Sequence, residues 1–256
     1  MTTTAMKVNE ASGGTAPLRN VTLCLQLLTR LNDRPAHLPG FGCIYGPSGY
    51  GKTTAAVYGA QRHSAYYIEC GASWTAGSLV EALSYEVSGQ PGRGTVARQT
   101  DEIIKLLAQD PRPIIIDEAD HLVKKTMVDV VREISDKSTA PVILIGEEEL
   151  PKKLRAFERA HNRVLEWVPA QPSDASDAAK LAKIYLPDLT IGDDLMRHIV
   201  ETTRGVTRQI VINIDRIREL ALQKSIRKIA LSDWGDQDVY TGSPKPRIAA
   251  PRRRSA

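Results

Sequence analysis

The chain has 256 residues, a formal net charge of +4, 42% hydrophobic and only 5% aromatic residues. These values are typical of a folded globular protein and exclude wholesale disorder or a fibrous repeat. No apolar run approaches the ~20 residues of a membrane span, and the first residues do not resemble a signal peptide. Three cysteines without metal-binding spacing indicate buried, reduced thiols, which suits a cytoplasmic protein.

Apolar periodicity predicts alternating strands and helices through the first two thirds of the chain. Strands are predicted over 41–45, 65–69, 113–116, 141–145 and 163–167. Helices are predicted over 18–31, 54–63, 76–87, 95–109, 126–134 and 149–159. Continuous apolar strands that alternate with helices predict a five-stranded parallel sheet covered on both faces.

The pattern changes at the proline-bearing hinge, residues 168–173. Beyond it only helices are predicted, over 174–185, 192–203, 207–224 and a short segment around Ser232. We therefore expect an α/β core over 18–168 and a small all-helical subdomain, the lid, over 169–240. The flanking segments, 1–17 and the basic 241–256, are expected to be disordered; the basic end is either a phosphate-seeking arm or a solubilising tail.

A phosphate-binding motif, GxxxxGK[ST], follows the first predicted strand: it reads Gly46-Pro47-Ser48-Gly49-Tyr50-Gly51-Lys52-Thr53, with Thr54 next. Its glycines let backbone N–H groups curl around a phosphate, and the following helix adds a positive field. Lys52 is expected to contact the β- and γ-phosphates of ATP. Thr53 is expected to offer its hydroxyl to Mg²⁺. The segment 46–54 is therefore the predicted nucleotide site.

Two carboxylates end the third predicted strand, at Asp117 and Glu118. A buried strand delivers such groups to the carboxyl edge of the sheet, beside the phosphate-binding loop. Asp117 is then expected to hold Mg²⁺ and Glu118 to polarise the attacking water. The four letters 117–120 also spell DEAD, but helicases of that type have two tandem domains and this chain has room for one. The match is treated as coincidental.

Arg208 is the third candidate, because it falls in the first turn of a predicted lid helix after Gly205. An arginine placed there can reach back over the nucleotide. A surface arginine at a helix start is the equally favoured alternative.

These three parts, in this order, resemble the AAA+ ATPases over roughly residues 18–234. The runs IIIDEADHLVKK, PVILIGEEELPKKLR and RGVTRQIVINIDRIRELAL look more narrowly like the transposition-helper branch, which includes the phage Mu B protein and the TnsC regulators. The resemblance implies a sensor residue after the fourth strand, where Glu147 stands in place of the usual Asn, Ser or Thr. It also implies a finger arginine supplied to a neighbouring subunit, either Arg159 or Arg163, of which Arg163 is favoured.

The resemblance further implies ATP and Mg²⁺ as cofactors, a homo-oligomeric ring or helical filament on double-stranded DNA, and recruitment of a transposase. Sequence-independent duplex contacts need basic side chains along phosphates. The predicted DNA contacts are Arg93, Arg98, Lys124 and Lys125. For each of them taken singly, a solvated surface charge is the favoured alternative.

Three other functions fit parts of the pattern. A helicase loader resembling DnaC or IstB shares the core and prefers single strands or a helicase. A secretion-associated ATPase resembling ExeA is disfavoured, because its relatives carry a membrane span. A nucleotide-binding adaptor that switches without hydrolysis has no need of a water-activating carboxylate such as Glu118.

Overall fold

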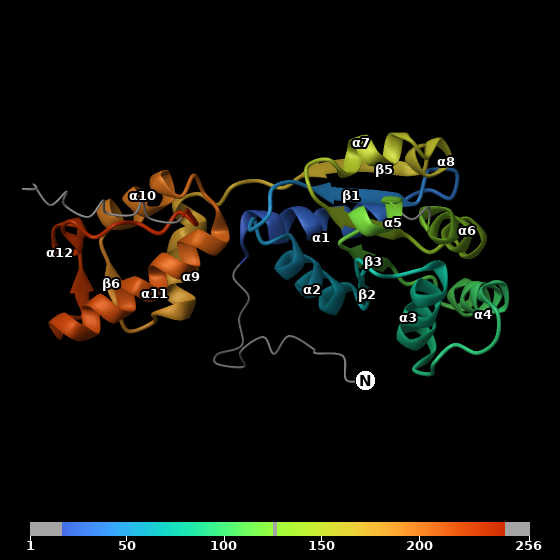
Figure 1. The fold of residues 1–256 in the computed structure, drawn as a ribbon, viewed down its shortest axis with the longest axis horizontal. Helices are drawn as coiled ribbons and strands as arrows, with labels where there is room; N and C mark the ends of the chain where they lie inside the picture. Colours follow the sequence, from blue (N-terminus) through green and yellow to red (C-terminus); the bar gives the residue numbers. More distant parts are fainter. Residues whose placement is uncertain (1–16, 125–126, 244–256) are drawn as a thin grey trace, which may run out of the picture.

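The computed structural model describes residues 17–124 and 127–243 (Figure 1). The predictions for the N-terminal segment, for Lys125 and for most of the basic C-terminal segment lie outside these residues. No helix within the described ranges is long and apolar enough to cross a membrane.

A five-stranded sheet forms the centre of the core, in the order β2-β3-β4-β1-β5. Every neighbouring pair is parallel. The strands are β1 (Phe41–Tyr45), β2 (Tyr66–Glu69), β3 (Ile114–Asp117), β4 (Val142–Gly146) and β5 (Val164–Pro169). All five predicted strands are confirmed, with ends that differ by one or two residues. Because all strands run the same way, their carboxyl ends share one edge of the sheet.

Helices cover both faces of this sheet, as predicted. Helices α1 (Arg19–Asn32) and α2 (Lys52–His63) pack on one face, where Ile115 and Ile143 point. The other face, where Ile114 and Ile116 point, is covered by α3 (Ala76–Ser88), α4 (Val96–Gln109), α5 (Asp120–Lys124), α6 (Val128–Ser138) and α7 (Leu150–Arg155). The alternation of isoleucines in β3 thus feeds two separate apolar layers, as expected for a strand buried on both sides.

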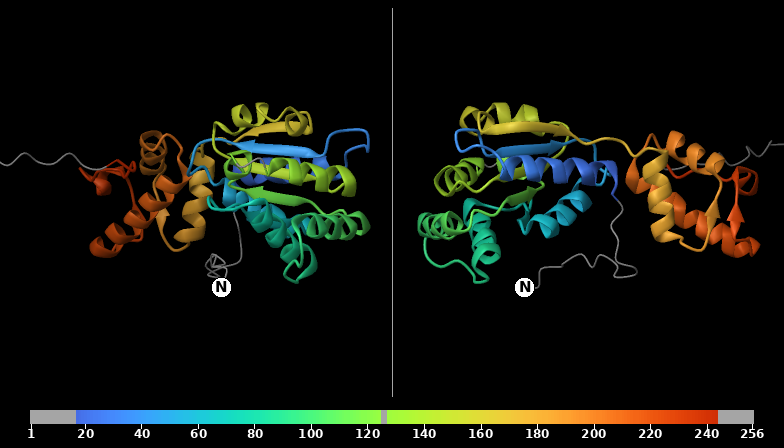
Figure 2. Two further views of the ribbon diagram at one scale, coloured as in Figure 1. Left: turned by 45° about the vertical axis from the view of Figure 1, so that its right-hand side comes forward. Right: turned by 180° about the vertical axis from the view of Figure 1, so that it is seen from behind.

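The lid has its own apolar core, set apart from the sheet (Figures 1 and 2). Its helices are α9 (Ala175–Tyr185), α10 (Asp193–Thr202), α11 (Thr207–Lys224) and α12 (Leu231–Trp234). The prediction that the lid is all-helical is wrong in one detail. A parallel pair of two-residue strands, β6 (Thr190–Ile191) and β7 (Lys228–Ile229), joins two of its loops. Two residues are too few to show a strand period.

The helix predicted over 149–159 is also divided. It ends with α7 at Arg155 and restarts as α8 (Glu158–His161), because Phe157 leaves the helical conformation with φ −118°. The Phe157 side chain packs against the apolar core at this break. Burial of one aromatic ring thus overrides a run of good helix formers. Helix α5 was not predicted.

Candidate nucleotide-binding site

The phosphate-binding loop, residues 46–53, runs from β1 directly into α2. Gly49 and Gly51 have φ angles of 84° and 79°, in the left-handed region that glycine adopts without a Cβ penalty. Gly51 is the N-cap residue of α2, so the positive end of a 12-residue helix faces the loop. The loop therefore combines left-handed glycines with a helix N-terminus, two features that favour phosphate binding.

The Lys52 side chain curls back into the loop. Its Nζ donates hydrogen bonds to the carbonyl oxygens of Gly46 at 2.7 Å and Pro47 at 2.9 Å. Burial lowers the pKa of Lys52, against the opposing field of nearby carboxylates, led by Asp117 and Glu118. The loop thus holds an ammonium group inside its own curve, close to the two acids that the sequence singled out. The negative phosphates of a bound triphosphate would pair with this ammonium group, which here bonds to carbonyl oxygens.

Asp117, only 3% exposed, ends β3 with both carboxylate oxygens engaged. Its Oδ1 accepts the Glu118 N–H at 2.8 Å, and its Oδ2 accepts the hydroxyl of Tyr67 at 3.2 Å. Glu118 follows in a left-handed conformation with φ 52°, which is rare for a residue with a side chain and is typical of functional sites. Burial and then the charge of Asp117 raise the pKa of Glu118. These properties suit a metal-binding carboxylate and a neighbouring general base. Tyr67 was not among the predicted site residues, because no motif includes it.

Glu147, the predicted sensor, follows β4 and is exposed. Its backbone N–H donates to Asp120 Oδ2 at 2.7 Å, and Asp120 Oδ1 accepts Lys153 Nζ at 2.5 Å. Asp120 therefore ties the loop after β3 to the end of β4 and to α7. Glu118, Glu147 and Lys153 line one open pocket of about 510 Å³. Asp120, the fourth residue of the DEAD string, therefore makes structural contacts with Glu147 and Lys153.

Replacing Asp120 with Ala is expected to destabilise the fold by about 2 kcal/mol, because the Glu147 N–H loses its buried acceptor and Lys153 its partner. Urea unfolding measures this difference. The exposed Asp101 on α4 provides the control, and its replacement with Ala is expected to change stability by less than about 0.5 kcal/mol. Equal stability of the two variants would show that Asp120 does not hold these loops together.

The lid touches the phosphate-binding loop through the first turn of α11. The backbone N–H of Arg208 donates to the Gly49 carbonyl at 3.0 Å. A Cβ on Gly49 would lie 3.0 Å from Val206 Cγ1 and 3.4 Å from the Arg208 Cβ, so the absence of a side chain allows this close approach. The Arg208 side chain is exposed. The Arg208 side chain therefore starts directly beside the phosphate-binding loop.

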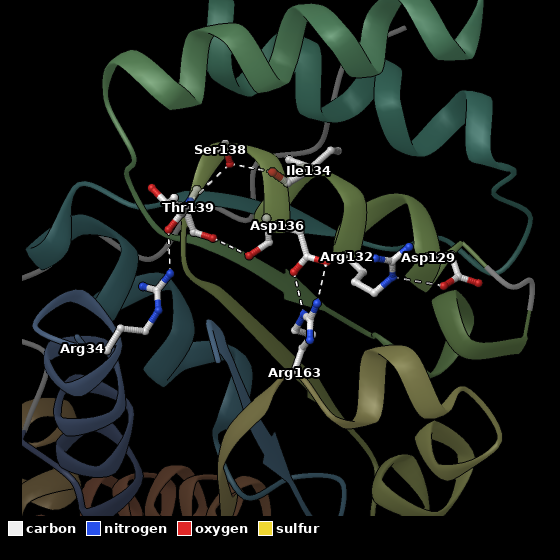
Figure 3. A network of polar contacts seen from close by, with 10 residues as sticks. Arg34, Asp129, Arg132, Ile134, Asp136, Ser138, Thr139 and Arg163 are labelled. Atoms are coloured by element: carbon white, nitrogen blue, oxygen red, sulfur yellow. Dashed lines mark hydrogen bonds and ion pairs between the residues drawn. The ribbon is translucent and has the colours of Figure 1, made fainter. Parts of the chain in front are cut away.

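The two finger candidates differ in their surroundings. Arg163 makes a two-pronged ion pair with Asp136 on α6, at 2.7 Å from Nε and 3.2 Å from Nη2, and Arg132 binds the same carboxylate (Figure 3). Burial raises the pKa of Asp136, but the hydrogen bonds from Arg163 and Arg132 outweigh it and lower that pKa overall. Arg163 therefore has a partner in its own chain. Arg159 is exposed on α8.

Two of the predicted DNA contacts lie close together on the surface. Arg93 and Arg98 are exposed at the α3–α4 connection, and both line a groove of about 340 Å³. Arg98 also pairs with Glu102 one turn along α4, which reduces its net charge. Lys124 ends α5, elsewhere on the core.

Comparisons with known proteins give one family match. Residues 36–154 match the family model described as an AAA domain. No curated protein matches the sequence.

Three solved structures are similar in fold. The Aeropyrum pernix ORC2 protein, in its ADPNP–ADP complexes, has a TM-score of 0.64 and 12% identity over 83% of this chain and 65% of that chain. The Aeropyrum pernix ORC1 protein in complex with DNA has a TM-score of 0.59 and 16% identity over 84% and 62%. Cdc6p from Pyrobaculum aerophilum has a TM-score of 0.60 and 17% identity over 87% and 68%. The chain thus spans about two thirds of their length. It shares the AAA+ P-loop fold of these structures, and the match to the AAA domain model lies within its α/β core.

Proposed function

We propose that the chain is a Mg²⁺-dependent ATPase that binds duplex DNA in its ATP state, as a ring or filament of copies, and recruits or activates a transposase. The main support for the ATPase part is the convergence of three elements on one loop. Lys52 lies inside the loop, and the first turn of the lid helix bonds to Gly49. Burial lowers the pKa of Lys52, and the charges of Asp117 and Glu118 oppose this shift.

Each of these residues has a chemical role in the proposal. The loop N–H groups and Lys52 would bind the phosphates, and Thr53 and Asp117 would hold Mg²⁺, which would supply charge neutralisation when bound. Glu118 accepts a proton from the attacking water. Arg208 adds positive charge from the lid, and an arginine of a neighbouring copy, Arg159 or Arg163, adds more.

The ion pair between Arg163 and Asp136 bears on this choice. Arg163 must leave a carboxylate of its own chain to reach a neighbour, whereas the exposed Arg159 need not. We therefore now favour Arg159 over Arg163 as the finger.

DNA binding is supported by charge and by one similar fold. Arg93, in the α3–α4 connection, and Arg98, in the first turn of α4, are exposed and line one groove, and the similar ORC1 structure is a complex with DNA. Contacts of this type are made to phosphates and are independent of base sequence. The transposition role rests on the sequence runs around Asp117, Glu147 and Arg208. A helicase-loader function would use the same ATPase site but would favour single strands.

A competition between duplex and single-stranded DNA separates these functions. With ATP present, the chain is expected to prefer a duplex, with affinity that falls steeply as salt rises. Removing both Arg93 and Arg98 by Ala substitution is expected to weaken duplex binding about tenfold and to reduce the salt slope by about 2.

The matched control is Arg62→Ala, which removes the same kind of charge from α2 on the opposite face of the sheet. It is expected to bind DNA like the wild type. Preference for single strands would favour the loader function, and equal losses in both variants would remove the α3–α4 connection as the contact. The recruitment step is tested by strand transfer with a purified transposase, where DNA carrying the ATP-bound chain should receive more insertions.

A further inference from the structure

Asn20, in the first turn of α1, joins two segments that are far apart in the sequence. Its side chain is 8% exposed. The Nδ2 group donates to the Tyr50 carbonyl in the phosphate-binding loop and to the Gln171 carbonyl in the hinge, each at 2.8 Å. Its Oδ1 accepts the Gln171 N–H, also at 2.8 Å. Both donor hydrogens and the acceptor of one amide are therefore used.

The hinge is bonded in turn to the lid. The backbone N–H of Ser173 donates to the Gly205 carbonyl at 2.9 Å, and the hydroxyls of Ser173 and Thr207 lie 2.7 Å apart. The next residue, Arg208, donates its N–H back to Gly49. These contacts form a closed ring that runs from the phosphate-binding loop through Asn20, the hinge and α11, and returns to the same loop.

The start of α1 is also held by the lid itself. The Arg19 N–H donates to Asp177 Oδ1 at 3.2 Å, and the Arg19 guanidinium forms an ion pair with Asp174. Leu18 packs against the apolar cores of both the sheet and the lid. These contacts are partly exposed, so each of them contributes little to stability. Asn20 is itself buried, and its side chain bonds to both the phosphate-binding loop and the hinge.

We infer that Asn20 is a positioning residue that holds the lid, and with it Arg208, against the phosphate-binding loop. Only an amide supplies this pattern of donors and acceptor from one side chain of this size. Aspartate keeps the shape and the acceptor but cannot donate, which leaves the carbonyls of Tyr50 and Gln171 without their partner. The inference rests on the proposed function in one respect, namely that Arg208 contributes to nucleotide binding.

The test is a double-mutant cycle on the affinity for a fluorescent ATP analogue. Asn20→Asp and Arg208→Ala are each expected to weaken binding about tenfold. The double variant is expected to bind no more than about twofold worse than the weaker of the two single variants, because Arg208 no longer helps once it is displaced. Asn32→Ala, an exposed asparagine at the other end of α1, is the matched control and should bind like the wild type.

Multiplied losses in the double variant, or wild-type affinity of Asn20→Asp, would overturn the inference. Hydrogen exchange gives a second measurement that needs no nucleotide. In Asn20→Asp the amide of Arg208 should exchange faster while the amides of β4 stay protected. Unchanged protection at Arg208 would also overturn it. A wild-type chain that binds no ATP would contradict the proposed function, yet the exchange result would still report on Asn20.

Discussion

Replacing Glu118 with Gln is expected to lower ATP turnover about 10³-fold while ATP binding is retained. The amide keeps the size of the side chain but cannot accept a proton from water, and general-base catalysis contributes a factor of this order. Steady-state phosphate release measures turnover, and a fluorescent ATP analogue measures binding. Because the chain is proposed to bind duplex DNA in its ATP state, a variant that keeps its ATP should also stay on duplex DNA longer than the wild type.

The pH profile provides a second reading of the same residue. Since burial and Asp117 raise the pKa of Glu118, the carboxylate protonates at a higher pH than an ordinary glutamate. As pH decreases, the wild-type turnover rate is therefore expected to fall at a pH above about 4.3, the ordinary pKa of a glutamate side chain. The residual turnover of Glu118→Gln should not show this fall as pH decreases. Glu81→Gln, an exposed change on α3, is the control. Turnover near the wild-type rate in Glu118→Gln would contradict the general-base role.

Replacing Lys52 with Ala is expected to weaken ATP binding by at least about 100-fold. The ammonium group is held in the loop by the carbonyls of Gly46 and Pro47, so it is already placed to meet the phosphates. Calorimetric titration measures the affinity, and circular dichroism checks that the variant folds. Lys105→Ala on α4 removes an exposed lysine and should leave binding unchanged. A folded Lys52→Ala variant that binds ATP like the wild type would move the phosphate site elsewhere.

The parts of the site that sequence predicts are those built from contiguous residues. The glycines, Lys52 and Thr53 follow one another after a strand, so their spacing alone predicts a phosphate-binding loop. Asp117 and Glu118 are predictable for the same reason, since three isoleucines followed directly by two acids indicate a buried strand and its carboxyl end. The order of the strands was not predicted, because it depends on crossovers that leave no local pattern.

The contacts that hold these parts in place join residues distant in sequence, and no period reveals them. Asn20 bonds to Gln171, and Asp120 bonds to Glu147 and Lys153. In the sequence Asn20 is one polar residue near the start of a helix, and Asp120 is one acid in a familiar four-letter string. Only the fold shows that both side chains are buried. Arg163 is the reverse case, since its ion pair with Asp136 gives it a structural contact that the sequence did not suggest.

The central claim is that ATP controls binding to duplex DNA. Fluorescence anisotropy of a labelled duplex tests it directly, with ATP, with ADP and without nucleotide, at about 0.15 M salt. Tight binding is expected with ATP alone, with equal affinity for duplexes of unrelated sequence. Absence of duplex binding in all three states, or binding of equal strength in all three, would contradict it.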